Sequence, residues 1–194
     1  MDNKDISRAQ TVAFTGHRLI ISADRQRVKD RLMEAIRKAY KDGYRVFISG
    51  MAYGFDLMAA ECVLELRSEC PDIKLMAAIP YRGQCERWRK ASQLKYWELL
   101  HKADEQIVQS PDYRPDCFLK RDRYMVEHAS RLIAYYNGIP KGGTFYTVNE
   151  AKRQGVMVET IYLTPLRCLD RHIGGNGALP IAAFPNTYNN TLCF

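Results

Sequence analysis

The chain has 194 residues, of which 46% are apolar and 26% are charged, a balance typical of a globular protein with a substantial core. No apolar run reaches the about 20 residues that a membrane-spanning helix needs, so we expect no membrane partner. The formal net charge is +7, and basic residues cluster in RGQCERWRK and LKRDR. Such clusters are either solvated helix faces or surfaces that attract anions, including nucleotides and nucleic acids.

The N-terminal half alternates between strand and helix patterns. A β-branched run at 11–15 predicts the first strand, and apolar residues at helical spacing predict a helix over 22–42. A strand at 45–49, a helix at 55–69 and an apolar strand at 73–79 follow. A strand that is apolar throughout is typical of a sheet buried on both faces.

The same alternation continues in the C-terminal half. A helix is predicted over 86–102, with Trp88, Ala91, Leu94, Trp97 and Leu100 at helical spacing. Strands at 105–109, 131–136 and 156–163 alternate with helices at 116–128 and from the glycines at 142–143 to about 154. Helices between consecutive strands predict an α/β fold, a Rossmann-like three-layer sandwich whose mostly parallel sheet has about six strands.

The chain shows no internal linker, so residues 1–163 are expected to form a single nucleotide-binding domain. Residues 164–194 are rich in proline, glycine and asparagine, and we expect an extension that packs on the domain or is partly disordered. The first ten residues contain no hydrophobic signal core, which predicts a cytoplasmic location. Six scattered cysteines without a C-x-x-C pair favour free thiols over a metal site.

Unusual residues follow four of the predicted strands. Ligands of such sheets bind beyond the carboxyl ends of the strands, so these residues are candidates for ligand contact. They are Gly16, His17 and Arg18 after the first strand; Ser49, Gly50, Gly54 and Asp56 after the second; Pro80, Tyr81 and Arg82 after the third; and Gly142, Gly143, Thr144 and Thr147 after the fifth.

The glycine joints at 50–56 and 142–147 favour a bound phosphate. Glycine lets the backbone approach a ligand, and a helix N-terminus offers unpaired N–H groups and partial positive charge. A tight turn is the competing interpretation of either joint alone. The familiar motifs do not fit, because no G-x-G-x-x-G follows the first strand and Thr144 stands where a P-loop requires lysine. No nucleophile elbow surrounds Ser49.

Several single residues keep two interpretations. His17 either contacts the ligand or caps its loop. Asp56 either caps the second helix, which is the favoured role, or holds a ribose hydroxyl. Arg121 is by default a solvated arginine, and Glu150 shares a helix face with Thr147 that can point toward the ligand, unless it is an ordinary surface glutamate.

Taken in order, FTGHR, SGMAYGFDLMAAE, IPYRGQ and RDRYMVEHASRLIAYYNG with KGGTFYTVNEA resemble the SLOG superfamily over about residues 11–163, and most closely its YpsA-like branch. The resemblance implies a Rossmann-like fold with glycine pockets for nucleotide-derived ligands. The related LOG-type enzymes, which cleave the base from nucleoside monophosphates, imply catalytic roles for Arg121 and Glu150. Here Lys141 replaces the proline of their loop and Tyr146 its third glycine, and one extra residue precedes Thr147.

Three functions follow as hypotheses. The first is binding of a nucleotide or nucleotide-derived phosphate, with a sensor or regulatory role and no other cofactor. The second is a nucleoside-monophosphate phosphoribohydrolase, and whether the protein is an enzyme stays open. The third is single-stranded DNA binding, as in the superfamily's DNA-processing members, by Arg82, Arg87, Arg89, Lys90, Lys120 and Arg123 with Tyr81, Trp88 and Tyr124. The superfamily also leaves a homodimer open as a partner.

Overall fold

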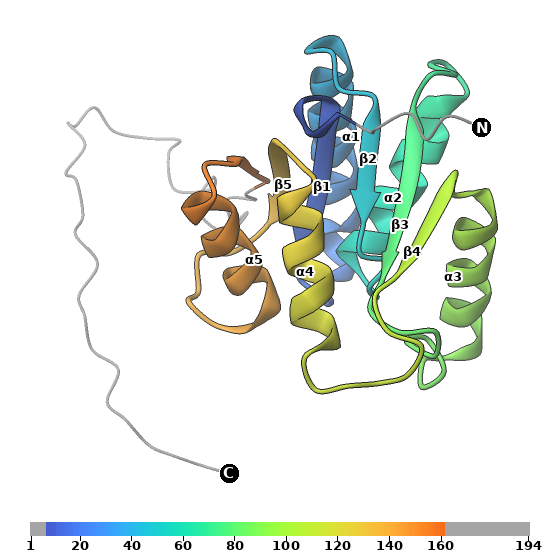
Figure 1. The fold of residues 1–194 in the computed structure, drawn as a ribbon. Coiled ribbons are helices and arrows are strands. Elements are labelled where there is room, and N and C mark those ends of the chain that lie inside the picture. The colour runs from blue at the N-terminus through green and yellow to red at the C-terminus, as the bar shows by residue number, and fades with distance from the viewer. Residues whose placement is uncertain (1–6, 162–194) are drawn as a thin grey trace, which may run out of the picture. The chain divides into compact units, whose positions relative to one another are not determined.

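The computed structural model describes residues 7–161, which form a parallel six-stranded sheet (Figure 1). The strands lie in the order β4-β3-β2-β1-β5-β6, and every neighbouring pair is parallel. The strands are β1 Thr11–Gly16, β2 Val46–Ser49, β3 Lys74–Ile79, β4 Glu105–Val108, β5 Arg131–Tyr135 and β6 Met157–Thr160. The predicted α/β class and Rossmann-like sandwich are therefore confirmed.

Five α-helices cover the two faces of the sheet. One face carries α1 Arg25–Lys41, α2 Phe55–Arg67 and α3 Lys90–Lys102, and the other carries α4 Cys117–Glu127 and α5 Gly142–Arg153 (Figure 1). Two short 3-10 turns, η1 Arg8–Gln10 and η2 Ser22–Asp24, precede β1 and α1. The neighbouring strands β1 and β5 are followed by α1 and α5, which lie on opposite faces of the sheet. The turns after these two strands therefore diverge at the carboxyl end of the sheet.

The core divides into two layers because side chains alternate along each strand. In β1, Val12 and Phe14 pack with Phe47 against α1 to α3, whereas Ala13 packs with Ile48 against α4 and α5. All five side chains are fully buried. Both layers anchor the strands rigidly, which places the turns at their carboxyl ends in a defined arrangement.

The start and buried face of α3 differ from the prediction. Residues 82–87 form turns, and the helix begins only at Lys90, after an extended Arg89. Its buried side chains are Tyr96, Leu99 and Leu100, while Leu94 and Trp97 are 60% and 44% exposed. The helix packs against α2, and only these three of its side chains are buried, so the broad apolar repeat did not identify the side of the helix that is covered.

The prediction for residues 164–194 lies outside the described residues. Within 7–161, no helix has the length and apolar character needed to traverse a bilayer.

Candidate functional site

The turns after β1, β2 and β5 meet around a hollow of about 270 Å³, called here the phosphate hollow. Gly16, His17 and Arg18 line it from the first turn, and Gly142, Gly143 and Thr144 from the last. The β2–α2 turn contributes Ala52 and Asp56, and α4 contributes Phe118, Arg121 and Asp122. Residues far apart in the chain are thus gathered at the carboxyl edge of the sheet.

His17 joins two of these turns. Its backbone N–H donates to the Tyr135 carbonyl at 3.2 Å, and its carbonyl accepts from the Phe55 N–H at 3.3 Å. Its side-chain Nε2 accepts from the Asn137 N–H at 3.2 Å, so the other ring nitrogen carries the proton when the imidazole is neutral. His17 therefore ties the loops together and also presents its ring to the hollow.

Arg121 is a buried residue, contrary to the solvated arginine expected as the default. Its side chain is 6% exposed, and its Nε donates to Asp122 Oδ1 at 2.7 Å. Its Nη1 donates to the Gly50 carbonyl and lies 3.8 Å from Asp56 Oδ2. A Cβ at Gly50 would overlap this guanidinium, so glycine at 50 makes room for Arg121 instead of approaching a ligand directly.

Asp56 does not cap α2, because the N-cap is Gly54 and no side chain caps the helix. The carboxyl group lies in the second position of the helix, and the residue is 5% exposed. Burial raises its pKa from the ordinary 3.8 to about 7, although nearby Arg121 opposes the shift. A buried carboxyl that titrates near neutral pH is a common feature of functional sites.

The N-terminus of α2 is already used by the protein itself. The Phe55 N–H donates to His17, the Leu57 N–H to Ala52, and the Met58 N–H to Gly54. Gly54 adopts a φ of 94°, and a Cβ there would collide with the backbone of Arg18. The joint at 50–56 therefore holds two turns together, and these three amides are used within the protein.

The N-terminus of α5 is open in contrast. Gly142 has a φ of 83°, which favours glycine, and Lys141 before it is exposed. Within residues 7–161, the amides of Gly142, Gly143 and Thr144 donate no hydrogen bond to another residue. A Cβ added at Gly143 would meet only Asp122 Oδ2, at 3.8 Å. Free N–H groups and the partial positive charge of a helix N-terminus favour an anion.

Other predicted site residues support the hollow from outside it. Ser49 is fully buried, and its Oγ accepts from the Met51 N–H at 3.1 Å and donates to the Asp56 carbonyl at 2.9 Å. Thr147 is fully buried and donates to the Gly143 carbonyl at 2.9 Å. Pro80 is buried, and Arg82 is exposed and does not line the hollow.

Glu150 is directed along α5 toward its C-terminal end. Its carboxylate accepts from Arg153 Nη2 at 2.6 Å and from Gln154 Nε2 at 2.7 Å. These hydrogen bonds lower its pKa to about 2. Glu150 does not line the phosphate hollow, so the structure separates it from Arg121, its predicted catalytic partner.

A second cavity of about 260 Å³, called here the aromatic hollow, adjoins the first. Arg18, Ala52 and Phe118 line both. Its other lining residues are Tyr53, Tyr81, Gln84, Arg87 and Trp88. The sequence analysis did not identify Phe118, Gln84, Lys141 and Asp122 as lining residues. Phe118 lies three residues before Arg121 on α4, and this helical spacing, which places the two on one face, could have pointed to it.

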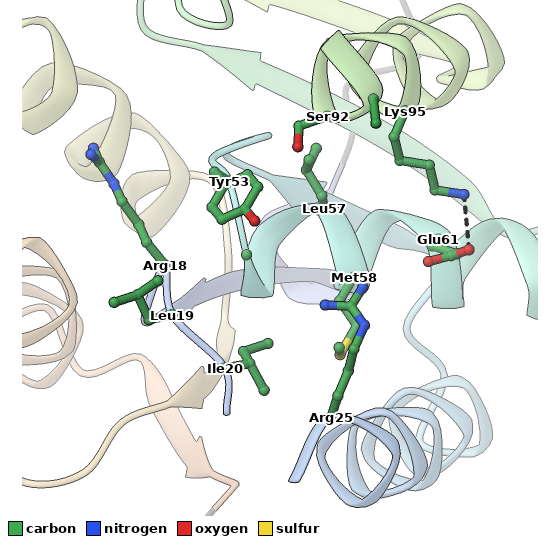
Figure 2. A pocket seen from close by; sticks show the side chains of 12 residues that line it. Arg18, Leu19, Ile20, Arg25, Tyr53, Leu57, Met58, Glu61, Ser92 and Lys95 are labelled. Carbon is green, nitrogen blue, oxygen red and sulfur yellow. Dashed lines mark hydrogen bonds and ion pairs between the residues drawn. The ribbon is translucent and has the colours of Figure 1, made fainter. Parts of the chain in front are cut away.

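A third hollow of about 250 Å³ lies between the β1–α1 turn, α2 and α3 (Figure 2). Its walls include the aliphatic Leu19, Ile20 and Leu57, and Lys95 donates to Glu61 at 2.8 Å across its rim. The guanidinium of Arg18 points away from this hollow in Figure 2. Lys95 of this hollow is therefore paired with Glu61, whereas Arg25, which also lines it, forms no ion pair within residues 7–161.

Comparison with known proteins places the chain in a family. The family model described as the YspA SLOG family (YpsA) matches residues 15–165. The uncharacterised SPbeta prophage-derived protein YoqJ of Bacillus subtilis is 32% identical over 140 residues, covering 66% of this chain and 81% of YoqJ. A UPF0398 protein of Bacillus pumilus is 32% identical over 130 residues, covering 66% of this chain and 69% of that protein.

A solved structure shares the fold. DNA processing protein A from Helicobacter pylori, a single-stranded DNA-binding protein, superposes with a TM-score of 0.61 at 18% identity, covering 84% of this chain and 70% of that one. At this identity the likeness concerns the fold alone. The family match and the curated relatives show that the chain belongs to the YspA SLOG family.

Proposed function

We propose that this protein binds a nucleotide or a nucleotide-derived phosphate in the phosphate hollow and acts as a sensor or regulator. The observation that carries the proposal is the set of amides at Gly142, Gly143 and Thr144, which have no partner within residues 7–161 and belong to residues that line the same hollow as Arg18. In residues 7–161, Arg18 and Lys141 form no ion pair with a carboxylate, whereas Arg121 is already paired with Asp122. The phosphate would therefore meet two uncommitted cations and a helix N-terminus.

Calorimetry with a panel of AMP, ADP, ATP, ADP-ribose and NAD tests the proposal. We expect at least one member to bind. Arg18→Ala removes a positive charge from the phosphate hollow and Gly143→Val adds bulk to it, so each should weaken that binding about tenfold or more. Arg82→Ala is the matched control, since Arg82 is an exposed arginine outside the hollow. Silence across the whole panel would overturn the proposal.

A phosphoribohydrolase has weaker support. Arg121 lines the phosphate hollow, but Glu150 is bonded to Arg153 and Gln154 outside it. The carboxyl group nearest to Arg121 in the hollow, besides Asp122, is Asp56. Chromatography for free base released from nucleoside monophosphates decides this alternative, and release that survives Glu150→Gln would remove that residue from the mechanism.

Single-stranded DNA is the second candidate ligand, favoured by the aromatic hollow. Arg87 lines it together with Tyr81 and Trp88, and base stacking on aromatic rings beside basic side chains is typical of strand binding.

The four described cysteines are unpaired, which is consistent with the reducing cytoplasm that we propose as the location.

A further inference from the structure

We infer that the aromatic hollow is the subsite for a nucleobase whose phosphate is held at the N-terminus of α5. The inference rests on the proposed function, which concerns the phosphate, and adds to it the place where the base of the same ligand binds. The shared chemistry is a base joined through a sugar to a phosphate, whether in a free nucleotide or in a single strand.

The first argument is that the two hollows adjoin each other. Arg18, Ala52 and Phe118 line both of them, so a ligand can extend from one to the other past a shared wall. Together they have the size of an ordinary small-molecule site, for which about 300–1,000 Å³ is typical.

The second argument is the aromatic character of the walls. Tyr53 is 43% exposed, and Tyr81, Trp88 and Phe118 are each partly exposed. The rings contact one another edge to face, Tyr53 with Trp88 at 5.8 Å and Tyr81 with Phe118 at 6.0 Å between centroids. Four partly exposed rings around one cavity provide apolar area that a planar base can cover by stacking.

The third argument concerns charge at the boundary. Arg18 lies over the Phe118 ring, with 5.7 Å from its Cζ to the centroid, and points away from the third hollow (Figure 2). Its guanidinium is therefore held between the phosphate hollow and the aromatic hollow. In the aromatic hollow, the buried Gln84 donates to the Met51 carbonyl at 3.2 Å and adds an uncharged polar group to the wall.

The third hollow is a poorer base site. Tyr53 is its single aromatic lining residue, and its ion pair between Glu61 and Lys95 would have to be desolvated by a base. A planar base gains more stacking area by contacting the four rings of the aromatic hollow.

Tryptophan fluorescence gives a direct test, because the chain has two tryptophans, Trp88 and Trp97, and only Trp88 lines the aromatic hollow. In the Trp97→Phe variant, Trp88 is the sole reporter. We expect AMP to quench it after correction for absorbance, and ribose 5-phosphate to bind without quenching and at least about tenfold more weakly. In the reverse variant, Trp88→Phe, AMP should leave the exposed Trp97 unquenched while calorimetry still detects binding.

Paired variants separate stacking from phosphate binding. Tyr81→Leu should reduce the preference for AMP over ribose 5-phosphate and leave the affinity for ribose 5-phosphate unchanged. Tyr113→Leu is the control, because Tyr113 is 61% exposed, contacts Tyr81 and does not line the hollow. Quenching of Trp88 by a short single-stranded oligonucleotide, but not by AMP, would support the base subsite and assign its source to a strand.

Two failures are distinguishable. If AMP and ribose 5-phosphate bind equally tightly, or if calorimetry detects binding of AMP or of the oligonucleotide while Trp88 is quenched by neither, the base subsite is overturned and the phosphate site stands. If neither ribose 5-phosphate, the oligonucleotide nor any member of the nucleotide panel binds, the proposed function itself is overturned.

Discussion

Asp56 couples the stability of the protein to pH. Its pKa is raised from 3.8 to about 7 by burial in the folded protein. The folded state therefore holds a proton that the unfolded state has lost, and the stability falls as the pH rises from about 4 to about 7. Integrated over that window, the loss is on the order of 4 kcal/mol. We expect Asp56→Asn to remove this loss. In urea unfolding, the free energy of unfolding of the variant minus that of the wild type should therefore increase as the pH rises.

The matched control is Glu127→Gln at the exposed C-terminal end of α4. Its curve of unfolding free energy against pH should follow that of the wild type above pH 5. The interpretation of Asp56 fails if Asp56→Asn and the wild type lose stability in parallel between pH 4 and 7.

At the scale of elements, Ser49 connects β2 to α2. Its hydroxyl accepts from Met51, a buried residue with a φ of 53°, and donates to the Asp56 carbonyl. Ser49→Ala leaves a buried N–H without its partner, which should lower the free energy of unfolding by about 1–3 kcal/mol. Ser92→Ala on α3 is the control, because the Ser92 hydroxyl makes no hydrogen bond within residues 7–161. An equal effect of the two changes on the urea midpoint would contradict this role.

The elements were more predictable than the contacts of their charged residues. Apolar runs and helical spacing identify strands and helices directly, because each strand of a parallel sheet is buried on both faces. Nothing local distinguishes Arg121 from an exposed arginine, since its burial depends on the Gly50 carbonyl from another crossover. The sequence likewise did not determine where the Glu150 side chain points. Thr147, on the same helix face, is buried in the core, and the Glu150 carboxylate accepts hydrogen bonds from Arg153 and Gln154 instead of reaching the hollow.

For the molecule as a whole, the strand order predicts how stability is distributed. β1 lies between β2 and β5, and its residues 12–14 are fully buried. β4, in contrast, is a mostly exposed strand at one edge of the described sheet. Amides of β1 should exchange most slowly in native-state hydrogen exchange, close to the rate set by global unfolding, and those of β4 much faster. Protection of β4 equal to that of β1 would show that the edge is covered by something else.

The net charge of +7 attracts any polyanion, so salt dependence separates general attraction from a built site. The affinity of a single strand falls with a log–log slope of about −0.7 for each phosphate neutralised. A nucleoside monophosphate held by the α5 amides and Arg18 places one phosphate in the hollow, so its slope should be no steeper than about −1. A strand that also reaches the exposed Arg87, Arg89 and Lys90 neutralises several phosphates, and its slope should be about −2 or steeper. Titrations of AMP and of an oligonucleotide over one range of salt compare the two. A steep slope for AMP would mean that the whole surface holds it, because three backbone amides and one arginine release few counterions.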